Sequence, residues 1–158
     1  MSKDWEIIAQ CLRAELADYG GLLNLFEAQQ RRLSGRDSET VLSFANQIEA
    51  QARLIAQSRS RREQAVAEFA DEKGRPTTSS LRAMLSLIEP DARPLLKALI
   101  TEVGILLHRV RRASRQNHTL LTRAVEAHHE TMQHLRPHAS IKAGSPAGRP
   151  GVASAHRR

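Results

Sequence analysis

Aromatic residues are scarce in this chain of 158 residues, at 3% of the composition. β-Strands are enriched in aromatic and β-branched residues, so this scarcity argues against a sheet. Leu, Ala, Arg, Glu and Gln dominate instead, and these residues are good helix formers. The composition therefore predicts an all-α protein.

Cysteine and long apolar runs are nearly absent as well. Cys11 is the single cysteine, which excludes an internal disulfide and fits a reducing compartment. The longest apolar region, residues 95–107, contains Lys97, Thr101 and Glu102, so it is not expected to span a membrane. The first ten residues lack the basic start and apolar run of a secretory signal. We therefore expect a cytoplasmic protein without membrane insertion.

Catalytic motifs are missing too. The sequence contains no Gly-rich phosphate loop after a strand, no CxxC pair and no nucleophile elbow. HHETMQH, residues 128–134, approaches the zinc signature HExxH, in which two histidines four residues apart share a helix face. Here His129 and His134 are five apart, and they lie about 100° and 240° around a helix from His128. We expect no metal, no cofactor and no enzymatic activity.

The net charge of +7 is concentrated near the end of the chain. Residues 136–158 contain five basic and no acidic residues, whereas the remaining 135 residues carry 19 basic and 17 acidic ones. This last segment is rich in Gly, Pro, Ala and Ser and has no apolar periodicity, which is typical of disorder. The sequence thus predicts a helical bundle domain over residues 1–136 and a disordered basic tail over 137–158.

Heptad spacing predicts two long helices in the first half of the chain. The first, from about Asp4 to Leu33, contains Trp5, Leu12, Tyr19, Phe26 and Leu33 at intervals of seven, with Ala9, Leu16 and Leu23 four after the first three. The second contains Val41, Ile48, Ile55 and Phe69 with Ala45, Ala52 and Val66, and Arg62 at a position expected to be apolar. Such seams pack lengthwise against other helices, and the short link at 34–40 makes the two helices antiparallel neighbours. Gly20-Gly21 predicts a bend or a close helix approach.

A short helix and a third long helix are expected after Gly74 and Pro76, which end the second helix. Ser79 or Ser80 can cap the short helix, which stops before Pro90. The third helix covers residues 91–135, and its apolar stripe includes Leu96, Leu99, Val103, Leu106, Leu107, Val110, Leu121, Val125, Met132 and Leu135. The predicted fold is three long antiparallel helices in a coiled-coil-like bundle plus one short helix.

Two arginine clusters form a candidate basic patch. They are Arg59, Arg61 and Arg62 on the second helix and Arg109, Arg111, Arg112 and Arg115 on the third. Antiparallel packing can place them at similar heights, where they would suit an acidic protein or a nucleic acid. Against nucleic acid, no aromatic residue lies nearby to stack on bases. Alternatively, the arginines are solvated or paired with Glu6, Glu15 or Asp18.

The third helix also carries features that suit a binding surface. Asn117 interrupts the apolar stripe, where a polar residue can fix helix register or partner choice; the other interpretation is a partly exposed Asn at a loose point of the bundle. Two adjacent apolar lines, for example Leu106 with Leu107 and Leu120 with Leu121, indicate either a wide core face or a groove for a partner's amphipathic helix.

The layout of the chain resembles the FlgN-type flagellar export chaperones. The matching segments are RRLSGRDSETVLSF (31–44), SRSRREQAVAEFA (58–70), SLRAMLSLIEP (80–90) and QNHTLLTRAVEAHHETMQHL (116–135). The resemblance covers about residues 5–136. It implies a cytosolic, non-catalytic protein that binds the C-terminal helical segments of hook–filament junction (hook-associated) proteins. It also implies that the protein prevents their premature assembly and delivers them to the flagellar type III export apparatus, either its gate or its ATPase.

The resemblance places client binding in the C-terminal part of the chain. By position, the candidate client-binding residues are Asn117, Leu120, Leu121, Val125, His128, Met132 and Leu135. Family members can carry a tyrosine near the chain end, but no aromatic residue follows Phe69 here. The alternative functions are a helical nucleic-acid-binding protein, which the lack of stacking aromatics disfavours, and a coiled-coil adaptor.

Overall fold

The fold of this chain, taken from a computed structural model, consists of helices. The structure describes residues 4–34 and 38–147, with side chains over residues 4–33 and 40–135, and these residues contain no strand. The elements are helix α1 (Asp4–Ser34), helix α2 (Ser38–Glu72), the 3₁₀ helix η1 (Arg82–Leu87) and helix α3 (Arg93–Ala147). The predicted order of three long helices and one short one is confirmed.

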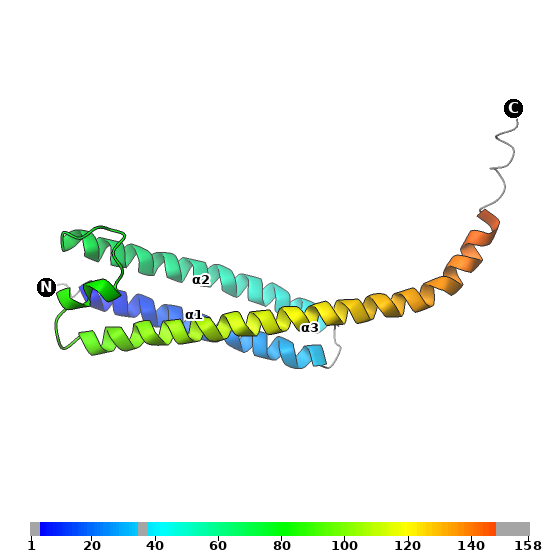
Figure 1. The fold of residues 1–158 in the computed structure, drawn as a ribbon, viewed down its shortest axis with the longest axis horizontal. Coiled ribbons are helices and arrows are strands. Elements are labelled where there is room, and N and C mark those ends of the chain that lie inside the picture. The colour runs from blue at the N-terminus through cyan, green and yellow to red at the C-terminus, as the bar shows by residue number, and fades with distance from the viewer. Residues whose placement is uncertain (1–3, 35–37, 148–158) are drawn as a thin grey trace, which may run out of the picture. The chain divides into compact units, whose positions relative to one another are not determined.

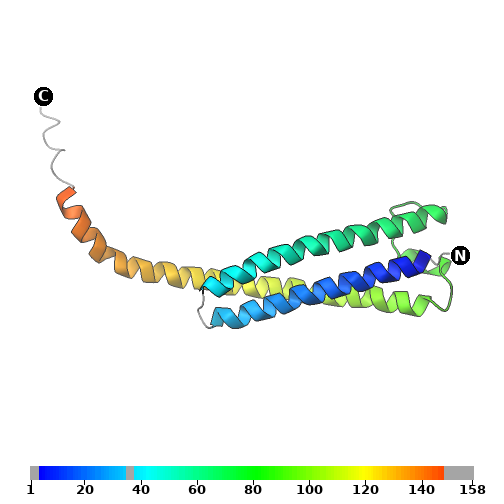
Figure 2. The same ribbon diagram turned by 180° about the vertical axis from the view of Figure 1, so that it is seen from behind.

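The chain divides into two compact units. The first extends to His118 and the second begins at Thr119, so that α3 contributes to both. In the first unit, α1 and α2 run antiparallel side by side, and α3 starts at the end of the unit where α1 starts (Figures 1 and 2). Helix η1 lies at this same end, between the end of α2 and the start of α3.

The core of the first unit consists of two clusters of buried side chains. One lies at the η1 end and joins all four elements: Ile8, Ala9, Leu12, Val66, Phe69, Ala70, Leu81, Met84, Ile88, Ala92, Leu96 and Leu99. The other lies farther along the three long helices: Tyr19, Leu22, Leu23, Phe26, Ile55, Val110 and Ala113. Burial of these side chains supplies the main driving force for packing the helices.

The buried line of α1 differs in part from the predicted seam. Leu12, Tyr19 and Phe26 are buried as expected, but a second buried line with heptad spacing runs through Ile8, Glu15, Leu22 and Gln29. Because Glu15 and Gln29 are polar, the pattern of apolar residues did not reveal this line. Glu15 and Gln29 are buried because partners in the folded protein form hydrogen bonds with their polar atoms.

The buried face of α2 is also rotated relative to the prediction. Ile55, Val66 and Phe69 are buried as expected, whereas Ala45 and Ala52 are exposed. Ser58 is buried instead. Alanine is small enough to occupy an exposed helix surface at little cost, so its presence at heptad positions did not mark the core.

The ends of α2 and η1 follow the predicted turn chemistry. Gly74 has a φ of 69°, and the Arg75 N–H donates to Ala70 O at 2.8 Å, which is the pattern of a glycine-terminated helix. The Ser80 hydroxyl accepts a hydrogen bond from the Ala83 N–H at 3.2 Å. The short helix is a 3₁₀ helix rather than an α-helix, since such connectors are often wound more tightly.

Helix α3 begins as predicted but ends later. Pro94 lies in its first turn, where the missing N–H costs nothing. The helix continues to Ala147, so Pro137 lies inside it and not at its end. A proline inside a helix removes one hydrogen bond and bends the axis, but the backbone on either side can remain helical. Residues 148–158 of the predicted tail lie outside the described residues.

Candidate functional site

Residues 121–135 of α3 present an apolar stripe to solvent. Its members follow one another at intervals of four, three, four and three residues: Leu121, Val125, His128, Met132 and Leu135. At about 100° per residue, this spacing keeps them within an arc of about 80° on one side of the helix. Leu121 is half-buried, whereas Val125, Met132 and Leu135 are 65%, 50% and 63% exposed.

The same side of α3 forms the core of the first unit. Val110 and Ala113 are buried there, as is Asn117. The stripe therefore has the same apolar spacing as the part of α3 that packs on α1 and α2, but most of its side chains are exposed. Exposed leucine, valine and methionine at a regular helical spacing are typical of a surface that binds another helix.

Asn117 is a structural residue of the first unit. Its side chain is only 1% exposed. Its Nδ2 donates to Phe26 O at 2.7 Å and to the Gln29 Oε1 at 3.1 Å, and Gln29 Nε2 in turn donates to Val41 O at 3.4 Å. These bonds connect α3, α1 and α2, which agrees with a role in helix register. The interpretation of Asn117 as a partly exposed residue is wrong.

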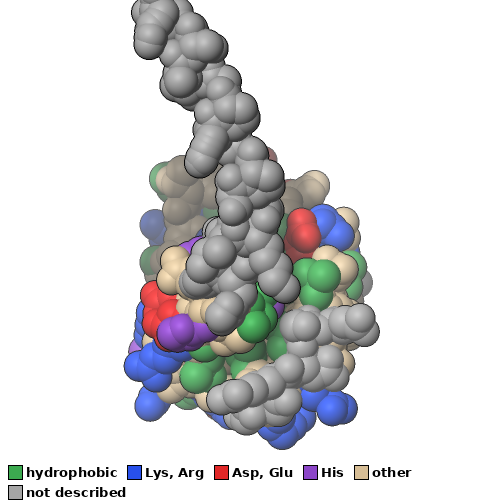
Figure 3. All heavy atoms as spheres, turned by 90° about the vertical axis from the view of Figure 1, so that its right-hand side faces the viewer, with side chains coloured by type: hydrophobic (Ala, Val, Ile, Leu, Met, Phe, Trp, Pro, Cys, Tyr) green, Lys and Arg blue, Asp and Glu red, His purple; other side chains and the backbone are tan. Residues whose placement is uncertain are grey.

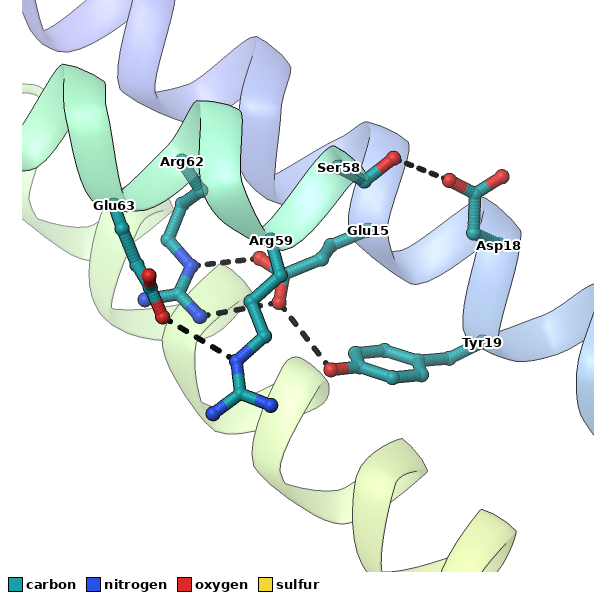
Figure 4. Close-up of polar contacts among 7 residues, drawn as sticks. All are labelled: Glu15, Asp18, Tyr19, Ser58, Arg59, Arg62 and Glu63. Atoms are coloured by element: carbon teal, nitrogen blue, oxygen red, sulfur yellow. Dashed lines mark hydrogen bonds and ion pairs between the residues drawn. The ribbon is translucent and has the colours of Figure 1, made fainter. Parts of the chain in front are cut away.

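The middle of the first unit contains a buried carboxylate. Glu15 is fully buried on α1, and Arg62 of α2 donates to it twice, through Nε at 2.7 Å and Nη2 at 3.1 Å. The Tyr19 hydroxyl donates to the same carboxylate at 3.4 Å. Figure 4 shows both side chains pointing at Glu15. The Arg62 side chain therefore forms an ion pair with Glu15 inside the first unit.

The pKa values in this network are shifted by the same contacts. The hydrogen bond to Glu15 raises the pKa of Arg62 above its ordinary value, against the opposing effect of burial. Burial is the main cause of a raised pKa for the Tyr19 hydroxyl, and the Glu15 charge adds to it. Arg62 and Tyr19 thus both hold their protons beside the carboxylate, as donors must.

Neighbouring polar contacts continue this interface along α1 and α2. The Ser58 hydroxyl donates to the Asp18 carboxylate. Gln51 Nε2 donates to Asp18 O at 2.9 Å. Sequence reasoning named Glu15 and Asp18 as possible partners of the arginines, but it missed Ser58 and Gln51. Gln51 and Ser58 lie on the same 4–3 spacing of α2 as Ile48, Ile55 and Arg62, and this spacing could have identified them.

The two arginine clusters do not form one uniform basic band. Arg62 pairs with Glu15, and Arg59 pairs with Glu63 on its own helix at 3.3 Å. Asn117, two residues beyond Arg115, contacts Phe26. Glu15 and Phe26 are about 16 Å apart along α1 at 1.5 Å per residue, so the far ends of the clusters lie at different heights.

Most arginines of the two clusters are exposed. Arg61, Arg109, Arg111 and Arg112 are exposed, and Arg115 has an interaction of its own. On the face shown in Figure 3, basic side chains lie in separate groups, with acidic and hydrophobic side chains between them. Neither arginine cluster contains an aromatic residue that could stack on bases.

None of the helices in the described part of the chain combines the length and the apolar character needed to cross a membrane. Within the same residues, no group of three or more His, Cys, Asp or Glu side chains is placed to hold a metal ion. His129 instead contacts Gln133, with 3.2 Å between its Nε2 and the amide nitrogen.

Comparison with known proteins gives a family match over nearly the whole chain. Neither the curated proteins nor the solved structures yield a match. The family model described as FlgN protein matches residues 1–149, which is nearly the whole chain. FlgN proteins are flagellar export chaperones, not enzymes. The chain, with its helical bundle and exposed apolar stripe, therefore belongs to the FlgN family.

Proposed function

We propose that this protein is a cytoplasmic chaperone for hook–filament junction (hook-associated) proteins. It binds their C-terminal helical segments, prevents premature assembly and delivers them to the flagellar type III export apparatus. The observation that carries this proposal is the exposed stripe of α3, in a chain whose family membership extends over residues 1–149.

The stripe is suited to a helical client. Val125, Met132 and Leu135 expose apolar surface at a helical repeat, and an amphipathic helix laid along them would bury its own apolar side at the same spacing. Methionine adapts its shape to different partners. Burial of one such side chain stabilises a complex by about 1.5–3 kcal/mol.

The contact set differs from the sequence expectation at one end. Leu120 and Leu121 are half-buried, and Asn117 is buried with its amide bonded inside the first unit. We therefore assign client contact to Leu121, Val125, His128, Met132 and Leu135, with Leu120 at the edge. Asn117 acts indirectly, by holding α3 in register where the stripe begins.

The exposed arginines of α3 suit a role in association with an acidic partner. Arg109, Arg111 and Arg112 are exposed, and basic groups near a binding surface accelerate encounter with acidic proteins. Such a contribution depends on ionic strength.

Complex formation with the hook–filament junction protein encoded in the same genome tests the proposal. We expect a soluble 1:1 complex by size-exclusion chromatography with light scattering. The double variant Val125→Ser/Met132→Ser should weaken binding about 100-fold, because it removes roughly 3 kcal/mol of apolar contact. Both residues are exposed in the free chain, so the fold should be unaffected.

The matched control changes the opposite side of the same helix. Arg123→Ser/Glu130→Ser alters two exposed residues that lie about 120° or more from every residue of the stripe. We expect this variant to bind as the wild type does. Absence of a complex with the wild-type chain, or equal loss in both variants, would contradict the proposal.

A further inference from the structure

The charged side chains of residues 119–135 lie on the opposite side of α3 from the apolar stripe. The charged residues of segment 119–135 are Arg123, Glu126 and Glu130. At about 100° per residue they lie between roughly 160° and 220° from His128, on the far side of the helix. The stripe itself thus has one ionisable member, His128, which is exposed.

The surroundings of His128 on the helix surface are uncharged. Residues three and four positions away are its neighbours on an α-helix, and these are Ala124, Val125, Thr131 and Met132. Neither a carboxylate nor a second basic group lies among them. His129 is turned by about 100° and contacts Gln133, and His134 lies about 240° around.

We propose that protonation of His128 weakens the binding of the client helix to the stripe. This inference rests on the proposed function, because it concerns the same binding surface. A neutral imidazole packs between Val125 and Met132 as part of the apolar contact. A protonated imidazole places a positive charge in the middle of that contact, without an acidic neighbour on α3 to pair with it.

The physical basis is the cost of burying a charge. Histidine ordinarily titrates near pH 6.5, so its charge changes within the physiological range. An apolar helix laid over the side chain removes water from it, and desolvation favours the neutral form. Binding is then linked to the release of one proton, so affinity falls as the pH falls through the range in which a histidine gains its charge. For a side chain that ordinarily titrates near pH 6.5, the expected loss between pH 7.5 and 5.5 is about tenfold.

The test measures affinity for the full-length hook–filament junction protein from pH 5.5 to pH 8, by titration calorimetry. We expect the dissociation constant of the wild-type chain to rise about tenfold from pH 7.5 to pH 5.5. His128→Leu should bind with a nearly constant affinity over this range, because its stripe is apolar at every pH. His134→Leu is the matched control, since it removes an exposed histidine on another side of the helix, and it should retain the wild-type profile.

The outcomes separate this inference from the proposed function. If the wild-type chain binds with the same dissociation constant at every pH, the inference is overturned and the proposed chaperone function is unaffected. A wild-type profile that persists in His128→Leu also overturns it, because another group must then be titrating. Failure of the wild-type chain to bind at any pH overturns the proposed function and the inference together.

Discussion

The carboxylate of Glu15 needs a positive charge and hydrogen-bond donors around it. Its side chain is fully buried, where an ionised carboxylate is costly unless it is paired and hydrogen-bonded. Arg62 and Tyr19 supply those bonds. A buried ion pair of this kind does not guarantee greater stability than apolar packing, but removal of one partner leaves the other charge uncompensated.

Substitution of Arg62 should therefore be costly. Arg62→Met leaves the Glu15 carboxylate buried beside the Tyr19 hydroxyl without its cationic partner, and we expect the free energy of unfolding to fall by about 3 kcal/mol. Chemical denaturation followed by circular dichroism measures this. The double variant Glu15→Leu/Arg62→Leu should recover most of the loss, since it replaces the pair with apolar side chains.

The control for this prediction lies one residue away. Arg61 is exposed, so Arg61→Met should change stability by less than about 0.5 kcal/mol. Equal effects of the two single substitutions would show that the Glu15 pairing does not stabilise the fold.

A second carboxyl group makes stability depend on pH. The pKa of Glu72 is raised, mainly by a hydrogen bond with the Asp4 carboxyl and then by the negative charge of Asp4. The folded state thus keeps a proton that the unfolded chain loses at lower pH. Stability consequently decreases as pH rises above the ordinary glutamate value near 4.5.

Glu72→Gln should remove this dependence. The variant cannot ionise, so it avoids repulsion with Asp4 and should melt at a higher temperature than the wild type at pH 7. Below about pH 4 the wild-type carboxyl is protonated as well, and the two melting temperatures should converge. Thermal melts from pH 3.5 to pH 7 would contradict the prediction if the difference were the same at every pH.

At the scale of the helix, α1 contains two adjacent glycines with different surroundings. A Cβ at Gly20 would meet no atom within 4 Å, whereas a Cβ at Gly21 would lie 2.8 Å from Gln51 Nε2. That nitrogen donates to Asp18 O. Of the predicted bend or close helix approach, the structure shows a contact at Gly21 with the end of the Gln51 side chain from α2.

This difference predicts unequal effects of alanine. Gly20→Ala should stabilise the protein by about 1 kcal/mol, the difference in helix propensity. Gly21→Ala gains the same propensity but displaces Gln51, and loss of its hydrogen bond costs about 1 kcal/mol. Urea denaturation should therefore show a clear gain for Gly20→Ala and little net change for Gly21→Ala. Equal gains would show that the Gln51 contact is unimportant.

At the scale of the whole molecule, the buried core and the exposed apolar stripe belong to different parts of the chain. Both core clusters lie in the unit that ends at His118. Every residue from Thr122 to Leu135 is exposed. Residues 122–135 therefore contain no buried apolar side chain, and their exposed apolar side chains suit the client contact that we propose.

Truncation after Leu121 should separate stability from function. A chain of residues 1–121 retains both core clusters and Asn117, so we expect its free energy of unfolding to stay within about 0.5 kcal/mol of the wild type. It should no longer bind the hook–filament junction protein. Denaturation and chromatography of the same preparation measure both properties. Cooperative unfolding together with retained binding would contradict the assignment of the stripe.

The sequence alone determined the helices and much of their order. Heptad spacing of Leu12, Tyr19 and Phe26 marked α1, and Gly74 marked the end of α2. Such features are local, because they depend on backbone propensity and on side chains within a few turns of each other. The same locality made the stripe from Leu121 to Leu135 visible before its exposure was known.

Only the tertiary structure decided which polar residues were internal. Glu15 and Arg62 are 47 residues apart, and Asn117 and Phe26 are 91 apart. In a sequence, a glutamate or an asparagine at a heptad position reads as an interruption, because burial of its polar atoms is favourable only when a distant partner bonds to them. The packing of three helices brings those partners together, and it thereby separates the buried Asn117 from the exposed residues that follow it.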